Sequence, residues 1–575
     1  MSINTYDGND VIIQDDDLFS TASFEPEAIE ISTTDDVFAA TADILEKEFE
    51  TLADVKQYLE TSGVTKAAVI FRDILLKILF RNNENTPTPF VILKESYHIN
   101  KVYYDSFSSH LSAKHFPLKH YCKRLFFLSC SSYSDDIFDK NEQELCELLI
   151  GSCVIRPSLE TENIIGQTLL NPKCFQKLKH EYICTSPYSL TMFGKRLSLN
   201  AFPYMMQDGE VITCAETTLI HLLDYFSNRY SSYRSIVPSD LFQIEKELSF
   251  ERIIPSKGMT YKTVSHVLTQ LNFHPKLYGF DNTDTIVDKR TMHHYIDSAI
   301  PVAVSLNPGE PEKSHSIVAI GITNNSLPLE KISSRLKPQN GLYFLDVSDL
   351  HDEYIIMNDS SAPYTKISMV LEGRLDKKFK FQIENNSGNF EISSIIAPLA
   401  RRMYLDDFNA SEIALNIISN DLLGLKKSID MINLKEYKQL GTTKENPIIY
   451  RLLLVRAGSF RRKRSFGLDK KSLRWKVYSS IPLPKFVWVC ELYSYASLKE
   501  GKALGEVVID ATASEMDGVS SAIIINYPYC FSYRTPDEPF DVFIKRYESK
   551  NQTDDWELIE PYMHFQEPQE NKMNI

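Results

Sequence analysis

The sequence predicts an α+β protein with antiparallel sheets. A run with helical periodicity, "CAETTLIHLLDYF" at 214–226, is followed by apolar runs typical of buried strands, "AIPVAVSL" at 299–306 and "HSIVAIGIT" at 315–323. A helix followed by strands at hairpin-like spacing indicates α+β and not a regular βαβ alternation. The length of 575 residues allows two to four domains.

The first elements follow an acidic start. Residues 1–50 hold fourteen Asp or Glu and one lysine, Lys47, so they carry almost all of the net charge of −15. This composition is typical of a solvated, flexible arm, which we place at 1–45. The rest of the chain is nearly neutral, which argues against a nucleic-acid partner. Without a signal segment or an apolar span, we expect a cytoplasmic protein with no membrane partner.

Three further regions follow the arm. Helical periodicity in "KAAVIFRDILLKILF" and short strands after residue 90 predict an α+β domain at 46–199. The helix at 214–226, a second helix in "GMTYKTVSHVLTQLNF" ended by Asn272, and the strands up to "EYIIMND" form a region at 200–375. Runs such as "NPIIYRLLLVRAG", "LRWKVYSSIPL" and "KFVWVCELYSYA" predict a mainly β domain at 376–575 with one or two helices.

Cys214 is the strongest candidate for a nucleophile. The thiolate is the attacking form of cysteine, and a helix N-terminus stabilises it through unpaired N–H groups and the helix dipole. The periodic run begins at Ala215, so Cys214 lies at such a start. Gln207, in the glycine-containing loop before it, is a candidate oxyanion donor, together with the backbone N–H of Cys214.

A base and an orienting group follow in chain order. His315 opens a predicted strand after a polar, proline-containing loop, so its imidazole can project from a sheet edge. Another predicted strand ends in Asn358-Asp359, where a group that orients the imidazole would lie. We take Asp359 as the orienting residue and Asn358 as the alternative.

This order of residues resembles the papain-like cysteine peptidases, and most closely the double-glycine leader peptidases that process bacteriocins. The motifs that carry the resemblance are "QDGEVITCAETTL", "IPVAVSL", "HSIVAIGI" and "NDSSAP", and the resemblance covers about residues 200–370 only. The resemblance implies a papain-like core with Cys214 as nucleophile, His315 as base, Asp359 as orienting residue and Gln207 as oxyanion donor. It implies a protein or peptide substrate, no cofactor and no metal.

Two other functions remain open on the same residues. One is a catalytically silent papain-like scaffold that binds a partner protein, and the other is acyl transfer, as in transglutaminase-like proteins. The large flanking regions indicate substrate selection, or regulation through a protein partner.

Several competing features have simpler interpretations. His221 is expected to be a packed or solvent-edge histidine, and His293-His294 a pair on a helix surface. The "RRKR" run at 461–464 is expected to be the solvated tip of a hairpin. Three histidines and a cysteine in "HLSAKHFPLKHYC" match no standard zinc spacing. The nine cysteines include no CxxC pair, which is typical of reduced thiols.

Overall fold

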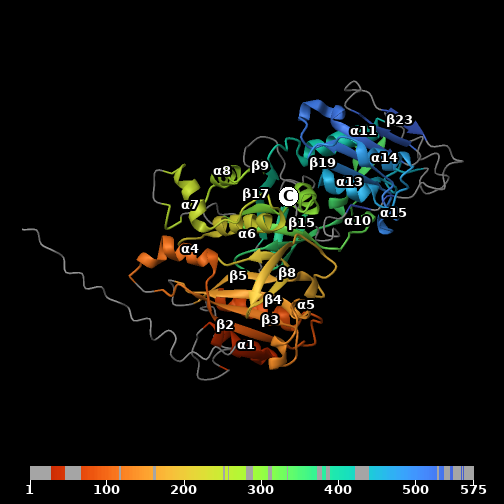
Figure 1. Cartoon of the computed structure of the whole chain (residues 1–575). Helices are drawn as coiled ribbons and strands as arrows, with labels where there is room; N and C mark the ends of the chain where they lie inside the picture. The colour runs from red at the N-terminus through yellow and green to blue at the C-terminus, as the bar shows by residue number, and fades with distance from the viewer. Residues whose placement is uncertain are drawn as a thin grey trace, which may run out of the picture.

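The fold was derived from a computed structural model. Its described residues form three sheets arranged along the molecule, and Figure 1 shows the N-terminal sheet at one end, the blue C-terminal sheet at the other and the helix α6 between them. The structure describes residues 27–45, 53, 66–115, 118–158, 163–249, 253–256, 258–279, 289–307, 314–332, 335–371, 379–383, 389–420, 439–527, 530–535, 544–547, 559 and 561–562.

The N-terminal sheet is antiparallel, with the strand order β1-β2-β3-β4-β5-β8-β7. Helix α3 (Lys66–Leu79) covers it with apolar side chains at helical spacing, among them the buried Phe71, Ile74 and Ile78. The other elements of this region are β1 (Glu27–Ile31), α1 (Thr34–Ile44), β2 (Phe90–His98), α4 (Lys101–Ser109), β3 (Cys122–Leu128), α5 (Glu142–Leu148), β4 (Leu149–Arg156), β5 (Ile164–Leu170), β7 (Ser186–Met192) and β8 (Lys195–Tyr204).

The central sheet closes on itself. Successive antiparallel pairings join β10, β11, β14, β15, β16 and β17, and β17 also pairs with β10, so the strands form a ring. Helix α6 (Cys214–Arg229) packs against β10 and β11 and is buried on nearly all sides. The remaining elements are β6 (Tyr182–Ile183), α7 (Pro238–Lys246), α8 (Tyr261–Gln270), β9 (Phe273–Tyr278), α9 (Lys289–Asp297), β10 (Val302–Asn307), β11 (His315–Ile322), β14 (Glu353–Met357), β15 (Thr365–Leu371), β16 (Phe379–Ile383) and β17 (Asn389–Ala400).

The C-terminal sheet has the order β12-β13-β18-β19-β20-β21-β22-β23, with one parallel pair, β13 and β18. Strand β18 is buried along almost its whole length, which explains its continuous apolar run. The elements are α10 (Leu329–Ile332), β12 (Lys337–Gln339), β13 (Leu342–Asp346), α11 (Asp407–Ser419), β18 (Ile448–Arg456), α13 (Ala457–Ser465), α14 (Leu473–Ser480), β19 (Phe486–Tyr493), α15 (Tyr495–Lys499), β20 (Gly505–Asp510), β21 (Ala522–Tyr527), β22 (Cys530–Tyr533) and β23 (Ile544–Tyr547).

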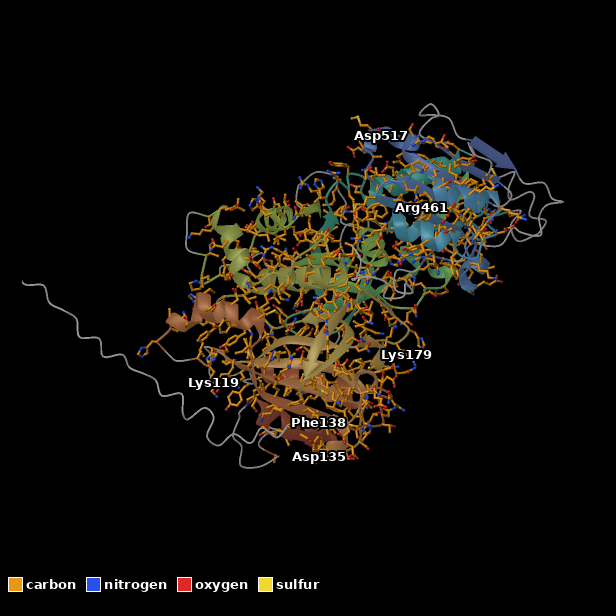
Figure 2. The ribbon with its side chains drawn as sticks, viewed as in Figure 1. Lys119, Asp135, Phe138, Lys179, Arg461 and Asp517 are labelled. Carbon is orange, nitrogen blue, oxygen red and sulfur yellow. The ribbon has the colours of Figure 1, made fainter. Side chains whose placement is uncertain are left out.

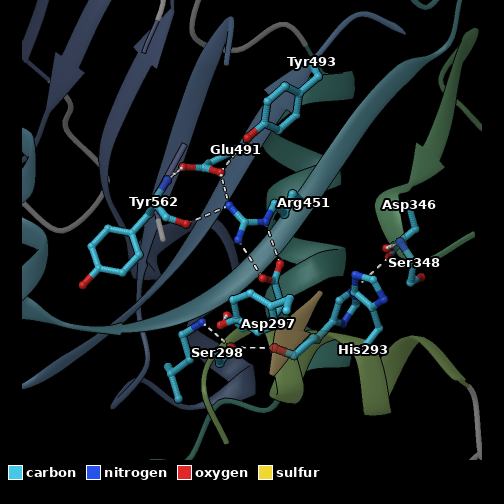
Figure 3. A network of polar contacts seen from close by, with 12 residues as sticks. His293, Asp297, Ser298, Asp346, Ser348, Arg451, Glu491, Tyr493 and Tyr562 are labelled. Carbon is cyan, nitrogen blue, oxygen red and sulfur yellow. Dashed lines mark hydrogen bonds and ion pairs between the residues drawn. The ribbon is translucent and has the colours of Figure 1, made fainter. Parts of the chain in front are cut away.

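A buried ion-pair network joins α9 to the C-terminal sheet (Figure 3). The Arg451 guanidinium donates to both carboxylate oxygens of Asp297, each at 2.6 Å, and to Glu491 at 3.0 Å. Tyr493 and the backbone N–H of Tyr562 also donate to Glu491, each at 2.7 Å. Because the charges are paired and hydrogen-bonded, the burial is tolerated and the central and C-terminal parts are held together.

The α+β prediction is confirmed, since helices and antiparallel sheets make up the described chain. The predicted stop of the second helix is also confirmed, because Asn272 follows α8 with a φ of 68°. Within the expected flexible arm, residues 27–45 instead include β1 and α1, and β1 pairs with β2; the earlier residues lie outside the described part.

The strand pairing also crosses the expected region limits. β16 and β17 follow residue 375 but belong to the central ring, and β12 and β13 precede it but join the C-terminal sheet. The division of the chain at 45, 199 and 375 stays a prediction.

Two expectations for the C-terminal region are wrong. The "RRKR" run lies in helix α13 and not at a hairpin tip, and the run "LRWKVYSS" forms α14 and not a strand. The Ser472 hydroxyl caps α14 by accepting the Trp475 N–H at 3.1 Å. Arg461, labelled in Figure 2, donates to the carbonyl of Ile481 at 2.6 Å, so α13 and α14 are tied together.

Candidate functional site

Cys214 is the first residue of α6 and is half-buried. Thr213 is the N-cap, and its backbone N–H donates to the carboxylate of Glu216 at 3.1 Å. Ser256 donates to the other oxygen of the same carboxylate. These bonds fix the start of the helix, where unpaired N–H groups place positive partial charge beside the Cys214 sulfur.

The loop before Cys214 is held by Asp208. One oxygen of its carboxylate accepts the backbone N–H groups of residues 210, 211 and 212, at 3.0, 2.7 and 2.8 Å. The other oxygen accepts from Arg156 at 3.2 Å. Gly209 supplies the turn with a φ of +74°, a conformation that favours glycine. The loop therefore has a fixed shape where it leads into α6.

Gln207 lies immediately before this turn. Its side chain is half-buried and makes no hydrogen bond to another described residue. The structure therefore places its amide in the loop that precedes the nucleophile candidate, seven positions from Cys214 in sequence. Its role as an oxyanion donor stays a prediction.

The register of two strands brings the base and its orienting group together. β11 and β14 are antiparallel, with Val318 opposite Met357. In an antiparallel pair, the start of one strand lies beside the end of the other. His315, three residues before Val318, therefore lies beside Asn358 and Asp359, which directly follow Met357.

His315 contacts both candidates for the orienting residue through the same ring nitrogen. Its Nε2 lies 2.8 Å from Oδ1 of Asn358 and 3.3 Å from Oδ1 of Asp359. The Cys214 side chain lies close enough to the ring to help raise the pKa of His315. Because Nε2 faces Asn358 and Asp359, Nδ1 is the nitrogen available to the sulfur. The structure thus brings together four of the five predicted site residues.

The electrostatics of the site favour a charged imidazole. Burial lowers the pKa of His315, but hydrogen bonds to Asp359 and Cys214 and the negative charge of Asp359 raise it to about 10. Burial raises the pKa of the Asp359 carboxyl, but the hydrogen bond and charge of His315 outweigh burial and bring that pKa below its usual value. The two groups therefore stabilise each other as an ion pair.

Two buried neutral groups stand behind Asp359. His221 accepts the backbone N–H of Met205 at its Nε2, at 2.8 Å, and its ring stacks on that of Tyr204. Burial lowers the pKa of His221 to about 4, so the ring is neutral. His221 is therefore a packed histidine and not a solvent-edge one, the first of the two environments predicted for it. The Oδ2 atom of Asp359 and the hydroxyl of Tyr204 are buried without a hydrogen-bond partner among the described atoms.

The competing histidines lie elsewhere. His293 and His294 are buried and not on a helix surface, so that expectation is wrong. His110 lies 3.1 Å from Glu210, and no group of three or more metal-ligating side chains occurs within the described residues.

Among the residues that the structure describes, no helix is long and apolar enough to cross a membrane.

Two residues of the site have no signal in the sequence. Ser360 donates to Asp359 at 2.9 Å, and Lys66 donates to Ser360 across a separation of 294 positions. No local motif marks such a distant pair.

Family models and curated protein sequences contain no match to this chain. A thiol at a helix start, beside an imidazole that an amide and a carboxylate orient, is an arrangement capable of nucleophilic attack on a carbonyl carbon.

Proposed function

We propose that the chain is a cysteine peptidase with a papain-like core, acting on a protein or peptide substrate. One observation carries the proposal, namely the position of Cys214 beside a histidine that Asn358 and Asp359 orient. The packing of α6 against β10 and β11, with the nucleophile at the start of the helix, supports the papain-like core.

In the first half of the reaction, Cys214 and the charged His315 form a thiolate–imidazolium pair, and the thiolate attacks the scissile carbonyl carbon. The carbonyl oxygen becomes an oxyanion that the backbone N–H of Cys214 and the Gln207 amide stabilise. His315 then gives its proton to the leaving amine. The carbon–nitrogen bond breaks, and the acyl group remains on the sulfur as a thioester.

In the second half, His315 takes a proton from water, and the resulting hydroxide attacks the thioester. The carbon–sulfur bond breaks, the acid product leaves, and the thiolate–imidazolium pair of Cys214 and His315 is restored. Asp359 and Asn358 keep Nε2 engaged throughout, so that Nδ1 moves the proton. Asp359 also stabilises the imidazolium that both steps pass through.

The test compares the native protein with Cys214→Ala in a cell lysate and identifies new peptide termini by mass spectrometry. We expect native protein to generate termini that Cys214→Ala does not. Equal sets of termini would contradict the peptidase. Incorporation of a labelled amine into lysate proteins without new termini would identify acyl transfer, and absence of both reactions would leave a scaffold that binds a partner.

A further inference from the structure

The N-terminal region reaches into the candidate site through helix α3. The Lys66 ammonium at the start of α3 donates to the hydroxyl of Ser360, and the Lys77 ammonium donates to the carbonyl of Pro363 at 2.9 Å. Both acceptors lie in the loop that follows β14 and carries Asp359. One helix therefore holds the catalytic loop at two points.

The same loop has a third anchor. The Tyr364 hydroxyl donates to the carbonyl of Leu170 at 2.7 Å and accepts the backbone N–H of Phe202 at 3.1 Å. Leu170 and Phe202 lie opposite each other on β5 and β8. The N-terminal sheet and α3 thus fix the loop together.

The contact of Lys66 continues to the imidazole. An ammonium group only donates hydrogen bonds, so the Ser360 oxygen accepts from Lys66 and directs its own hydrogen toward Oδ1 of Asp359, at 2.9 Å. That same Oδ1 atom lies 3.3 Å from Nε2 of His315. A continuous chain of polar contacts runs from Lys66 through Ser360 and Asp359 to His315.

The charge of Lys66 matters because of what else surrounds Asp359. The titratable groups that face this carboxylate are His315, His221, Tyr204 and Lys66. His221 and Tyr204 are buried and neutral at physiological pH. Among these described neighbours, Lys66 and His315 are the cations, so Lys66 is the positive charge that stabilises the carboxylate independently of the imidazole.

We infer that Lys66 is a positioning residue of the proposed triad, acting through Ser360 to hold Asp359 ionised and aimed at His315. This inference rests on the proposed function. It makes the N-terminal region part of the active site, in addition to any role in selecting substrates. Lys66 itself does not touch the substrate.

The experiment measures the rate of Cys214 alkylation by iodoacetamide in the full-length protein as a function of pH. Lys66→Met removes a positive charge that stabilises the anions of the site. We expect the midpoint of the acidic limb to move up by about half a pH unit, the effect of one partly screened charge. Ser360→Ala should shift it in the same direction, and the double variant should shift it no further than Lys66→Met.

Two controls isolate the role of Lys66. Lys77→Met removes an ammonium that binds the same loop but not Asp359, so its profile should match the native one. Lys66→Arg keeps the charge and should also match. A Lys66→Met profile that matches the native one, or a Lys77→Met shift as large, would overturn the inference while leaving the peptidase intact. If native Cys214 is alkylated no faster than the other cysteines, the proposed function fails, and the inference with it.

Discussion

Two histidines of this protein, His315 and His294, have the same charge state and opposite surroundings. Burial lowers the pKa of both rings, and acidic neighbours raise it to about 10 in each case. The His294 side chain is 4% exposed, and its two ring nitrogens lie 3.2 Å from Asp407 and 2.9 Å from Asp346. The His315 side chain is 22% exposed and uses one nitrogen for Asn358 and Asp359.

A charged histidine with acidic partners therefore does not by itself define a catalytic site. Both nitrogens of His294 are occupied by carboxylates, so no ring atom remains to exchange a proton with a thiol or a substrate. His315 keeps Nδ1 for Cys214 and is open to solvent. We therefore assign chemistry to His315 and stability to His294.

The substitution expected to change peptide turnover most is His315→Gln, which tests the catalytic role of His315. The variant loses the proton acceptor and donor, so we expect peptide turnover to fall by about 10²- to 10⁴-fold. Because the variant also leaves Asp359 without its imidazolium, we expect some loss of stability in urea, but a smaller loss than for His294→Gln, since His315 pairs with one carboxylate and is 22% exposed. Native-like turnover in a folded His315→Gln protein would contradict a catalytic His315.

His294→Gln should do the opposite. It leaves Asp346 and Asp407 buried without their cation, which costs about 3–5 kcal/mol of unfolding free energy. The folded pKa of His294, about 10, lies above its ordinary value of 6.5, so its contribution is complete below pH 6.5 and is lost as pH rises through 10.

The carboxylate partners of His294, Asp346 and Asp407, set the acidic end of the pH range in which this ion pair stabilises the fold. Their pKa values are lowered because His294 outweighs their burial, so their contribution is present above about pH 4 and is lost at lower pH. Urea unfolding between pH 4 and 10 should therefore show the largest gap between native and His294→Gln from about pH 4 to 6.5. A constant gap at every pH would exclude the ion pair as its cause.

Gln207→Ala tests a residue that acts only on the oxyanion. Turnover should fall by about 10²-fold, the effect of losing one donor to the oxyanion. The rate of Cys214 alkylation should stay native, since iodoacetamide forms no oxyanion. A loss of alkylation instead would mean that the variant disturbs the loop held by Asp208.

The smallest expected loss of turnover is that of a substitution at Asn358. One partner of His315 is this neutral amide, whereas both partners of His294 are carboxylates. Asn358→Ala removes one neutral hydrogen bond, which contributes about 1 kcal/mol, and should slow turnover about fivefold to tenfold. Asp359→Ala removes the charge as well and should slow it more. The reverse order, measured on the same peptide, would make Asn358 the principal orienting residue.

The sequence predicts those parts of the site that a local pattern marks. The helix start at Cys214, the strand that begins at His315 and the strand that ends before Asn358 all have patterns of their own. Their convergence then follows from antiparallel pairing. Lys66 could not be predicted, because its partner Ser360 lies 294 positions away.

The burial of charged residues could not be predicted from the sequence either. Arg464 belongs to a run that looks solvated, but it donates to Glu491 at 2.7 Å and to Glu506 at 2.9 Å from within α13. Likewise, His294 is charged and buried because Asp346 and Asp407 approach it from distant segments. Composition alone places such residues at the surface, since burial of a charge depends on partners that only the fold supplies.

The alkylation rate of each of the nine cysteines in the native protein, measured by mass spectrometry, tests directly whether Cys214 is a nucleophile. Cys146 is the matched control, because it is half-buried like Cys214 but lies near Ser198 and not near a histidine. The site predicts that Cys214 reacts at least about tenfold faster than Cys146 at neutral pH, and that His315→Gln abolishes the difference. Equal rates at Cys214 and Cys146 would contradict a nucleophilic Cys214.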